Sequence, residues 1–375
     1  MLDKGNKRNT FIPSLAAIKN DKVNKLMKRL YNLDYLRGFA AFGIMFYHYL
    51  SWTFGNFSAD TFMARLGIYG VSVFYVLSGL TLYYVYYVKM QPSIKGVITF
   101  FKKRILRIFP LLWLVTVTAI LLSRKIPDFS DLFLNLTGLF GFIKWQTYFS
   151  AGVWSIGNEL VFYVFFPFLI LFAKSYRFLF IILSAFIFLL YIYFAFVKLN
   201  SELTLSNQWK NYVNPLNQVF LFLGGFLIGL LFNKTKINNA TILSLLAIGL
   251  GLFVFIPADG NSINLVTGVN RLVFTFCCFL ICFCFYKLTF KFPVFVHKPL
   301  TLLGKASYSV YLLHPIIHDL VGRFRNHTIH FPESVRLILS IFLTLVTAYF
   351  TYEYFEKYFV KLAKRTGNNC CQQSV

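Results

Sequence analysis

Long apolar blocks separated by short polar stretches run through most of the chain. A helix needs about twenty apolar residues to cross the hydrocarbon core of a bilayer, and most blocks are close to that length. A shorter apolar piece, 131–143, fits either a re-entrant segment or one lying at the interface. The pattern predicts an all-α integral membrane protein, a bundle of about ten transmembrane helices. The predicted spans are 35–54, 67–88, 104–123, 152–173, 177–198, 214–232, 240–257, 267–287, 301–321 and 335–360.

The distribution of Lys and Arg predicts how these spans are oriented. With the N-terminus in the cytoplasm, 26 of the 37 cations fall in or beside the cytoplasmic segments and 10 on the opposite side. Cytoplasmic loops of membrane proteins carry such an excess. A crossing at 131–143 would reverse every later loop and remove the bias. We therefore expect both termini in the cytoplasm and a multi-pass protein of the plasma membrane, the inner membrane if the cell is Gram-negative.

Composition supports a membrane protein and argues against nucleic-acid binding. The chain is 58% hydrophobic and 13% charged, whereas soluble domains carry about 25% charged residues. The net charge of +24 follows the loops and forms no basic stripe with interleaved aromatics. We expect a basic cytoplasmic leader at 1–30, a transmembrane domain at 31–362 and a cytoplasmic tail at 363–375. No grouping of Cys and His suggests a metal site.

The first span carries ionisable residues that a lipid-facing helix would not tolerate. Arg37 and His48 are eleven residues apart, which places both on one helix face with roughly 16 Å between them along the axis. Such groups usually face a bundle interior or a wet cavity, so the pair fits the start of an active site. The alternative is that Arg37 reaches lipid phosphate and His48 is a hydrogen-bonded core histidine.

The third and fourth spans add further charged candidates. Arg104 and Arg107 lie three residues apart at the cytoplasmic end of the third span, so they share a helix face. Paired guanidinium groups suit bidentate phosphate binding, although an ordinary positive-inside flank would look the same. Glu159, inside the fourth span, must meet a cation, share a proton or line water.

Two other stretches contain small or polar groups at membrane depth. Ser78 precedes Gly79 in the second span, where small residues let helices approach closely or let a ligand pass. Ser307 and Tyr308 lie at the cytoplasmic start of the ninth span. His314, further along that span, needs a polar partner.

These stretches together resemble the integral-membrane acyltransferase 3 family. Five pieces match in order: LDYLRGFAAFGIMFYH, VFYVLSG, RILRIFP, WSIGNELVFYVFFP, and LGKASYSVYLLHP with a trailing YEYFEKYF. The likeness covers residues 31 to about 360. One departure is Tyr358, where the family usually has a proline.

The resemblance implies transfer of an acyl group, most often acetyl from acetyl-CoA, to a hydroxyl of a cell-surface or exported carbohydrate. His48 would act as general base or as a transient acyl carrier. Arg37 would hold donor phosphate or stabilise developing negative charge, and Glu159 would orient His48 or bind sugar hydroxyls. The expected substrate-binding residues are Arg104, Arg107, Ser78, Ser307, Tyr308 and His314.

The resemblance also implies partners, and the buried ionisable residues leave one competing function open. Acetyl-CoA or another acyl-CoA would be a co-substrate, with no permanently bound cofactor. The acceptor would be lipopolysaccharide O-antigen, capsule or exopolysaccharide, in free or lipid-linked form, and the resemblance leaves open peptidoglycan, a lipid, a small molecule or a succinyl donor. Polysaccharide-assembly proteins or a second copy of the chain remain open as partners. The competing function is a proton-coupled transporter or an exporter of a lipid-linked or anionic sugar.

Overall fold

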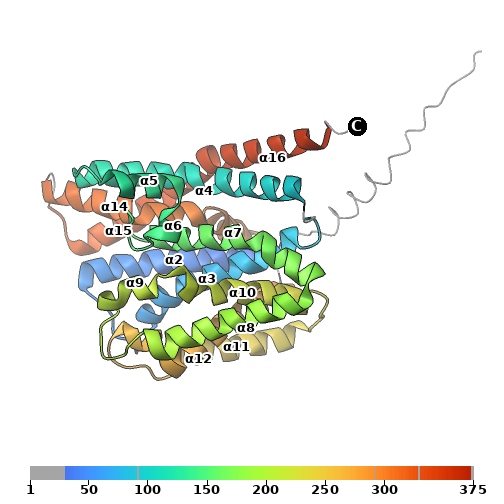
Figure 1. The fold of residues 1–375 in the computed structure, drawn as a ribbon. Coiled ribbons are helices and arrows are strands. Elements are labelled where there is room, and N and C mark those ends of the chain that lie inside the picture. Colours follow the sequence, from blue (N-terminus) through green and yellow to red (C-terminus); the bar gives the residue numbers. More distant parts are fainter. Residues whose placement is uncertain (1–29, 91–92, 291, 328–329, 373–375) are drawn as a thin grey trace, which may run out of the picture. The chain divides into compact units, whose positions relative to one another are not determined.

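Helices account for nearly all of the structure, a computed structural model that describes residues 30–90, 93–290, 292–327 and 330–372; the side chains of 327 and 365–372 are not described. No β-strand occurs in these ranges. The longer helices run side by side (Figure 1). The α-helices are α2 (Tyr31–Phe54), α3 (Phe62–Tyr86), α4 (Ile94–Ser123), α5 (Phe129–Thr137), α6 (Phe140–Ile143), α7 (Val153–Ser175), α8 (Arg177–Tyr193), α9 (Trp209–Tyr212), α10 (Pro215–Phe232), α11 (Asn239–Phe255), α12 (Gly268–Lys287), α13 (Val294–Lys305), α14 (Ser307–His327), α15 (Glu333–Phe350) and α16 (Lys357–Gln372).

Each of the ten predicted spans coincides largely with helix, which confirms the all-α membrane class. Within the described ranges, seven segments are long and apolar enough to cross a membrane: α3, α4, α7, α8 with the π-helical turn after it, α10, α12, and α15 with its continuation. Helix α11 is apolar but shorter. Helices α2 and α14, which carry the ionisable candidates, are not among the seven.

The extents of the helices differ from three of the predicted segments. The span at 301–321 is broken at Ala306, where α13 ends and α14 begins. The last span contains a π-helical segment, Thr351–Glu356, between α15 and α16, and α16 continues into the region predicted as a tail. Helix α4 begins at Ile94, well before the predicted start, because its basic first turns continue the helix out of the apolar block. The predicted leader at 1–30, apart from Leu30, and residues 373–375 lie outside the described residues.

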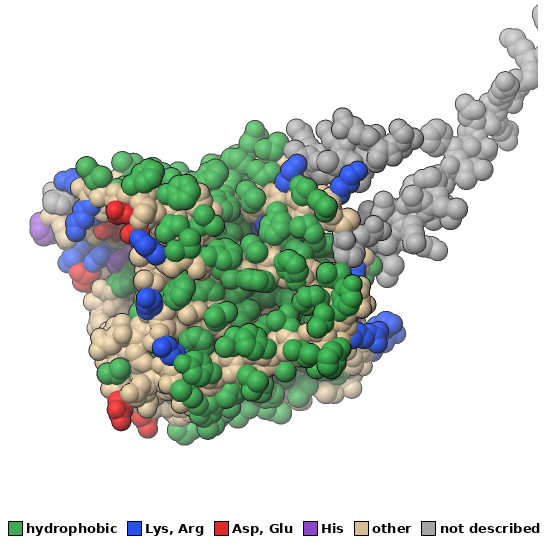
Figure 2. Space-filling model, in the orientation of Figure 1, with side chains coloured by type: hydrophobic (Ala, Val, Ile, Leu, Met, Phe, Trp, Pro, Cys, Tyr) green, Lys and Arg blue, Asp and Glu red, His purple; other side chains and the backbone are tan. Residues whose placement is uncertain are grey.

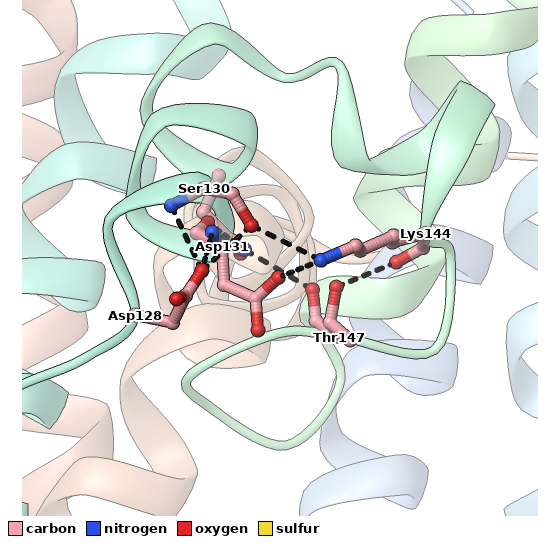
Figure 3. A network of polar contacts seen from close by, with 6 residues as sticks. Asp128, Ser130, Asp131, Lys144 and Thr147 are labelled. Carbon is pink, nitrogen blue, oxygen red and sulfur yellow. Dashed lines mark hydrogen bonds and ion pairs between the residues drawn. The ribbon is translucent and has the colours of Figure 1, made fainter.

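The apolar piece at 131–143 forms two short helices, neither long enough to cross a bilayer. A turn at Gly138 (φ +76°) separates them. Asp128 caps α5 by accepting hydrogen bonds from Ser130 and Asp131, and these donors lower the pKa of the Asp128 carboxyl. Lys144 Nζ lies 2.8 Å from Asp131 Oδ1 and joins the two ends of the segment (Figure 3).

The outer surface is apolar over the middle of the bundle. Phe178, Leu189 and Phe255 are each more than half exposed, at 75%, 63% and 82%. Figure 2 shows hydrophobic side chains covering the central part of one face, with charged side chains toward its two ends. Apolar groups this exposed would be unfavourable in water and are expected in contact with lipid tails.

Helices α3 and α10 pack with their backbones in close contact at two glycines. A Cβ added to Gly79 would lie 2.0 Å from the carbonyl oxygen of Phe222, and one on Gly225 would lie 2.0 Å from that of Val76. Of the two alternatives for Gly79, this contact supports close helix packing. The contact fixes the position of α3 and therefore of Ser78, the residue before Gly79.

Substitution of Gly79 by alanine should disrupt this packing. The added methyl group would force the α3 and α10 backbones apart, at a cost of about 1–3 kcal/mol. We expect Gly79→Ala to lower the melting temperature of the detergent-solubilised protein. Gly251→Ala in α11 is the control, because nothing lies within 4 Å of its added Cβ. Equal melting temperatures for the two variants would contradict the close contact.

Candidate active site

A cavity of about 180 Å³ lies among α2, α3, α4, α7 and α14. It combines apolar walls with hydroxyl, guanidinium and carboxylate groups. Seven of the nine candidate residues line it, whereas His48 and His314 do not. The seven are Arg37, Ser78, Arg104, Arg107, Glu159, Ser307 and Tyr308.

Glu159 is held by two hydroxyl groups. The Ser78 hydroxyl donates a hydrogen bond of 2.6 Å to Glu159 Oε1, and the Tyr163 hydroxyl donates to the same oxygen. Ser78 and Tyr163 also lie within 3.0 Å of each other. Among the described residues no cation forms an ion pair with Glu159, so these hydroxyls supply its polar partners.

Arg37 reaches the cavity from the N-terminal part of α2. Its Nη2 donates to Thr81 Oγ1 at 2.6 Å, and its Nη1 lies 3.9 Å from Asp34 Oδ1 one turn earlier. Asp34 therefore offsets part of the charge of Arg37 from outside the cavity lining. The guanidinium is fixed between α2 and α3 and does not extend along the surface.

Arg104 and Arg107 project from one face of α4, as their spacing predicts. The Arg104 guanidinium packs 5.6 Å from the ring centre of Tyr86 and 5.7 Å from that of Tyr163, and it donates to the Tyr86 hydroxyl at 3.3 Å. Arg107 is exposed. With Arg37, the cavity is lined by three guanidinium groups and one carboxylate, so its net charge favours an anionic ligand.

Tyrosines on α14 join that helix to its neighbours at the cavity wall. The Tyr308 hydroxyl donates to the Ile108 carbonyl oxygen on α4 at 2.7 Å. One turn further, the Tyr311 hydroxyl lies 2.7 Å from Ser155 Oγ and donates to the Gly152 carbonyl oxygen at 3.0 Å. Tyr311 and Ser155 therefore link α14 to the start of α7.

His48 on α2 and His314 on α14 form a hydrogen-bonded pair next to Tyr311. His48 Nδ1 lies 2.9 Å from His314 Nε2, and the two rings are within 11° of parallel. The indole of Trp52 stacks over His48 with its centre 5.0 Å away. The Tyr49 hydroxyl donates to the His314 carbonyl oxygen at 2.9 Å, which fixes α14 against α2.

The hydrogen bonds assign the tautomers of the pair. His314 Nδ1 lies 3.3 Å from the Val310 carbonyl oxygen, which can only accept, so Nδ1 carries the proton. In the neutral ring, His314 Nε2 is then the acceptor, and His48 Nδ1 must donate to it. This leaves the lone pair of neutral His48 on Nε2, which makes no hydrogen bond to any described residue. His48 Nε2 is therefore able to accept a proton.

The cavity and the histidine pair are adjacent along α14. Tyr311 lines the cavity, and its ring centre lies 6.0 Å from that of His314. The ring of Phe74, also in the cavity wall, packs 5.8 Å from Tyr311. Arg37 and His48 lie three helical turns apart on α2, and Tyr311 is the contact between the cavity lining and the histidine pair.

Several lining residues were missed by the sequence analysis: Thr81, Ser155, Tyr163 and Tyr311. Each had a usable signal, because each lies three or four residues from a candidate and hence on the same helix face. Thr81 follows Ser78 by three, and Tyr163 follows Glu159 by four. Trp52 likewise follows His48 by four.

These features define a helical membrane protein with a cationic cavity next to a histidine pair. A family model described as "Acyltransferase domain" matches residues 30–353, nearly all of the helical bundle. The chain belongs to this family, the acyltransferase 3 family, and membership indicates acyltransferase activity in general. No curated protein and no solved structure matched the chain.

The hydrogen bonds around Glu159 can be tested by a double-mutant cycle. Tyr163→Phe removes one donor to the carboxylate, and Glu159→Ala removes the oxygen that accepts from it. Because both act on one interaction, we expect their effects on unfolding free energy to be non-additive by about 0.5–3 kcal/mol. Strictly additive effects in thermal or denaturant unfolding would contradict a direct Tyr163–Glu159 bond.

Proposed function

We propose that the protein is a membrane-embedded O-acyltransferase that moves acetyl from cytoplasmic acetyl-CoA to a hydroxyl of an exported or cell-surface carbohydrate. The acceptor classes are lipopolysaccharide O-antigen, capsule and exopolysaccharide. Family membership supports acyl transfer. The finer proposal is supported by the arginine-lined cavity and by the His48–His314 pair, which are neighbours along α14 through the ring contact of Tyr311 with His314.

The cavity suits one end of an acyl-CoA. Three arginines with a single, hydroxyl-bound carboxylate provide sites for phosphate groups. Its volume, about 180 Å³, is below the roughly 300–1,000 Å³ of pockets that enclose a drug-sized ligand. The nucleotide of coenzyme A would therefore remain outside, near Arg104 and Arg107, while the pantetheine arm carries the thioester past Ser78 and Tyr308 toward Tyr311.

His48 would perform the proton transfer. Its Nε2 takes the proton of the acceptor hydroxyl, the hydroxyl oxygen attacks the thioester carbonyl, and the carbon–sulfur bond breaks. The imidazolium then returns the proton to the departing thiolate, so that the products are the ester and free coenzyme A. His314 is the positioning residue in this scheme, because it holds His48 in the required tautomer. Arg37, three turns away, is better placed for the donor than for the thioester carbonyl.

A second route uses the same lone pair as a nucleophile. His48 Nε2 attacks the thioester carbonyl, the carbon–sulfur bond breaks, and coenzyme A leaves as the thiolate from an acyl-imidazolium. The acceptor hydroxyl oxygen then attacks the acyl carbon, its proton passes to the thiolate, and neutral His48 is regenerated. In either route Glu159 would bind acceptor or donor hydroxyls, since its hydroxyl partners are Ser78 and Tyr163 and the partner of His48 is His314.

The membrane arrangement supports transfer from one side to the other. We propose that the chain crosses the plasma membrane ten times, through the seven segments named above together with α2, α11 and α14. Both termini would then lie in the cytoplasm. The cation bias of the loops supports this orientation. It puts Arg104 and Arg107 at the cytoplasmic end and His48 with exposed Trp52 (40%) toward the outer face, where an exported or lipid-linked acceptor is found.

Turnover of labelled acetyl-CoA by the purified protein tests this function. We expect thiol release with an added acceptor glycan in the wild type, and a loss of about 10²–10⁴-fold in His48→Ala. Label retained on His48 before acceptor is added would identify the acyl-imidazole route. If the folded protein shows no turnover and does not bind acetyl-CoA, the result would favour a transporter or another acyl donor.

Binding measurements separate donor recognition from catalysis. Arg104→Ala removes a cavity guanidinium, and we expect acetyl-CoA affinity to fall roughly 10- to 100-fold, the loss of one charged hydrogen-bonding group. Lys102→Ala is the matched control, because Lys102 is exposed on the same helix and does not line the cavity. Equal losses in the two variants would show that only general surface charge attracts the donor.

A further inference from the structure

Two arginines outside the cavity are almost completely buried, and they differ in how their charge is accommodated. Arg65 and Arg271 are 2% and 4% exposed. Neither forms an ion pair with a described carboxylate. Arg65 is surrounded by carbonyl oxygens: its Nε donates to Ala59, its Nη1 to Phe253 and its Nη2 to Ile256, at 3.3, 2.9 and 2.7 Å. All three of its nitrogens are thus satisfied by the backbone.

Arg271, at the start of α12, is not satisfied in this way. Its Nη2 donates to the backbone oxygen and to the side-chain oxygen of Asn217, at 2.9 and 2.5 Å, and its guanidinium packs 4.5 Å from the ring centre of Tyr191. Its Nη1 is buried and has no hydrogen-bond acceptor among the described residues. A buried charged donor without an acceptor costs several kcal/mol.

A small cavity lies beside this guanidinium. Its volume is about 10 Å³, close to the minimum that holds one water-sized occupant. Besides Arg271, its polar lining residues are Ser72, Tyr212, Gln218 and Thr275, and the hydroxyls of Ser72 and Tyr212 form no hydrogen bond to a described residue. No acidic side chain is among the lining residues. Three of the residues that line this space, Arg271, Ser72 and Tyr212, therefore each carry a donor group that has no acceptor among the described residues.

We propose that this cavity binds a single small monovalent anion, of which chloride is the most abundant. A halide ion accepts hydrogen bonds from several donors at once and neutralises the buried guanidinium, whereas a water molecule supplies no charge. The anion would join α12 to α3, α9 and α10, since Arg271, Ser72, Tyr212 and Gln218 come from those helices. The site is structural and does not depend on the acyl-transfer proposal.

Thermal unfolding in equimolar sodium chloride and sodium gluconate tests the proposal. Binding to the folded state raises the melting temperature with ligand concentration, so we expect about 2–4 °C higher values in chloride. Arg271→Gln should unfold at the same temperature in both salts. Arg65→Gln is the matched control: it should be less stable than the wild type and still respond to chloride.

Two further measurements keep the proposal falsifiable if Arg271→Gln does not fold. Ser72→Ala should shift the chloride response to higher concentration, and crystals grown in bromide should show an anomalous peak beside Arg271 Nη1. Equal wild-type melting temperatures in the two salts, with no bromide peak, would mean that water fills the cavity and would overturn the proposal. A full chloride response in Arg271→Gln would also overturn it.

Discussion

Ionisable and polar side chains at membrane depth must find partners inside the bundle, and this requirement organises the structure. Lipid tails offer no hydrogen bonds, so Glu159 is held by two hydroxyls, Arg37 by Thr81, and His48 by His314. Each of these contacts joins two different helices except the one between Tyr163 and Glu159. The polar groups therefore bind the helices together around the cavity, while the lipid-facing surface stays apolar.

Close backbone packing places these groups accurately. The glycine contact between α3 and α10 fixes the wall that carries Ser78, and Tyr308 fixes α14 against α4 through the Ile108 carbonyl. Because α2 and α14 each contribute to both the cavity and the histidine pair, a shift of either helix would change both together. In the proposed function, donor binding and proton transfer would therefore both depend on the positions of these two helices.

Much of this arrangement could be predicted from the sequence. The apolar blocks located the helices, and helical spacing placed Arg104 and Arg107 on one face. The break at Ala306 and the π-helical segment Thr351–Glu356 were not predicted, although polar residues interrupt the apolar pattern at both places, GKAS at 304–307 and TYEYFE at 351–356. The partner of His48 lies 266 residues away, and no local pattern reports a contact at that separation. The same holds for Arg271, which is buried against Tyr191 and Asn217, residues 80 and 54 positions away in the chain.

The central claim is that one tract runs from the arginine-lined cavity to His48 Nε2. It is tested most directly by an experimental structure of the protein with a non-reactive acetyl-CoA analogue. We expect the phosphates of the analogue to bind beside Arg104 and Arg107, its pantetheine arm to lie along Ser78 and Tyr308, and its acyl carbon to lie beside His48. Analogue bound with its phosphates away from both arginines, or with its acyl end separated from His48 by Tyr311, would contradict it.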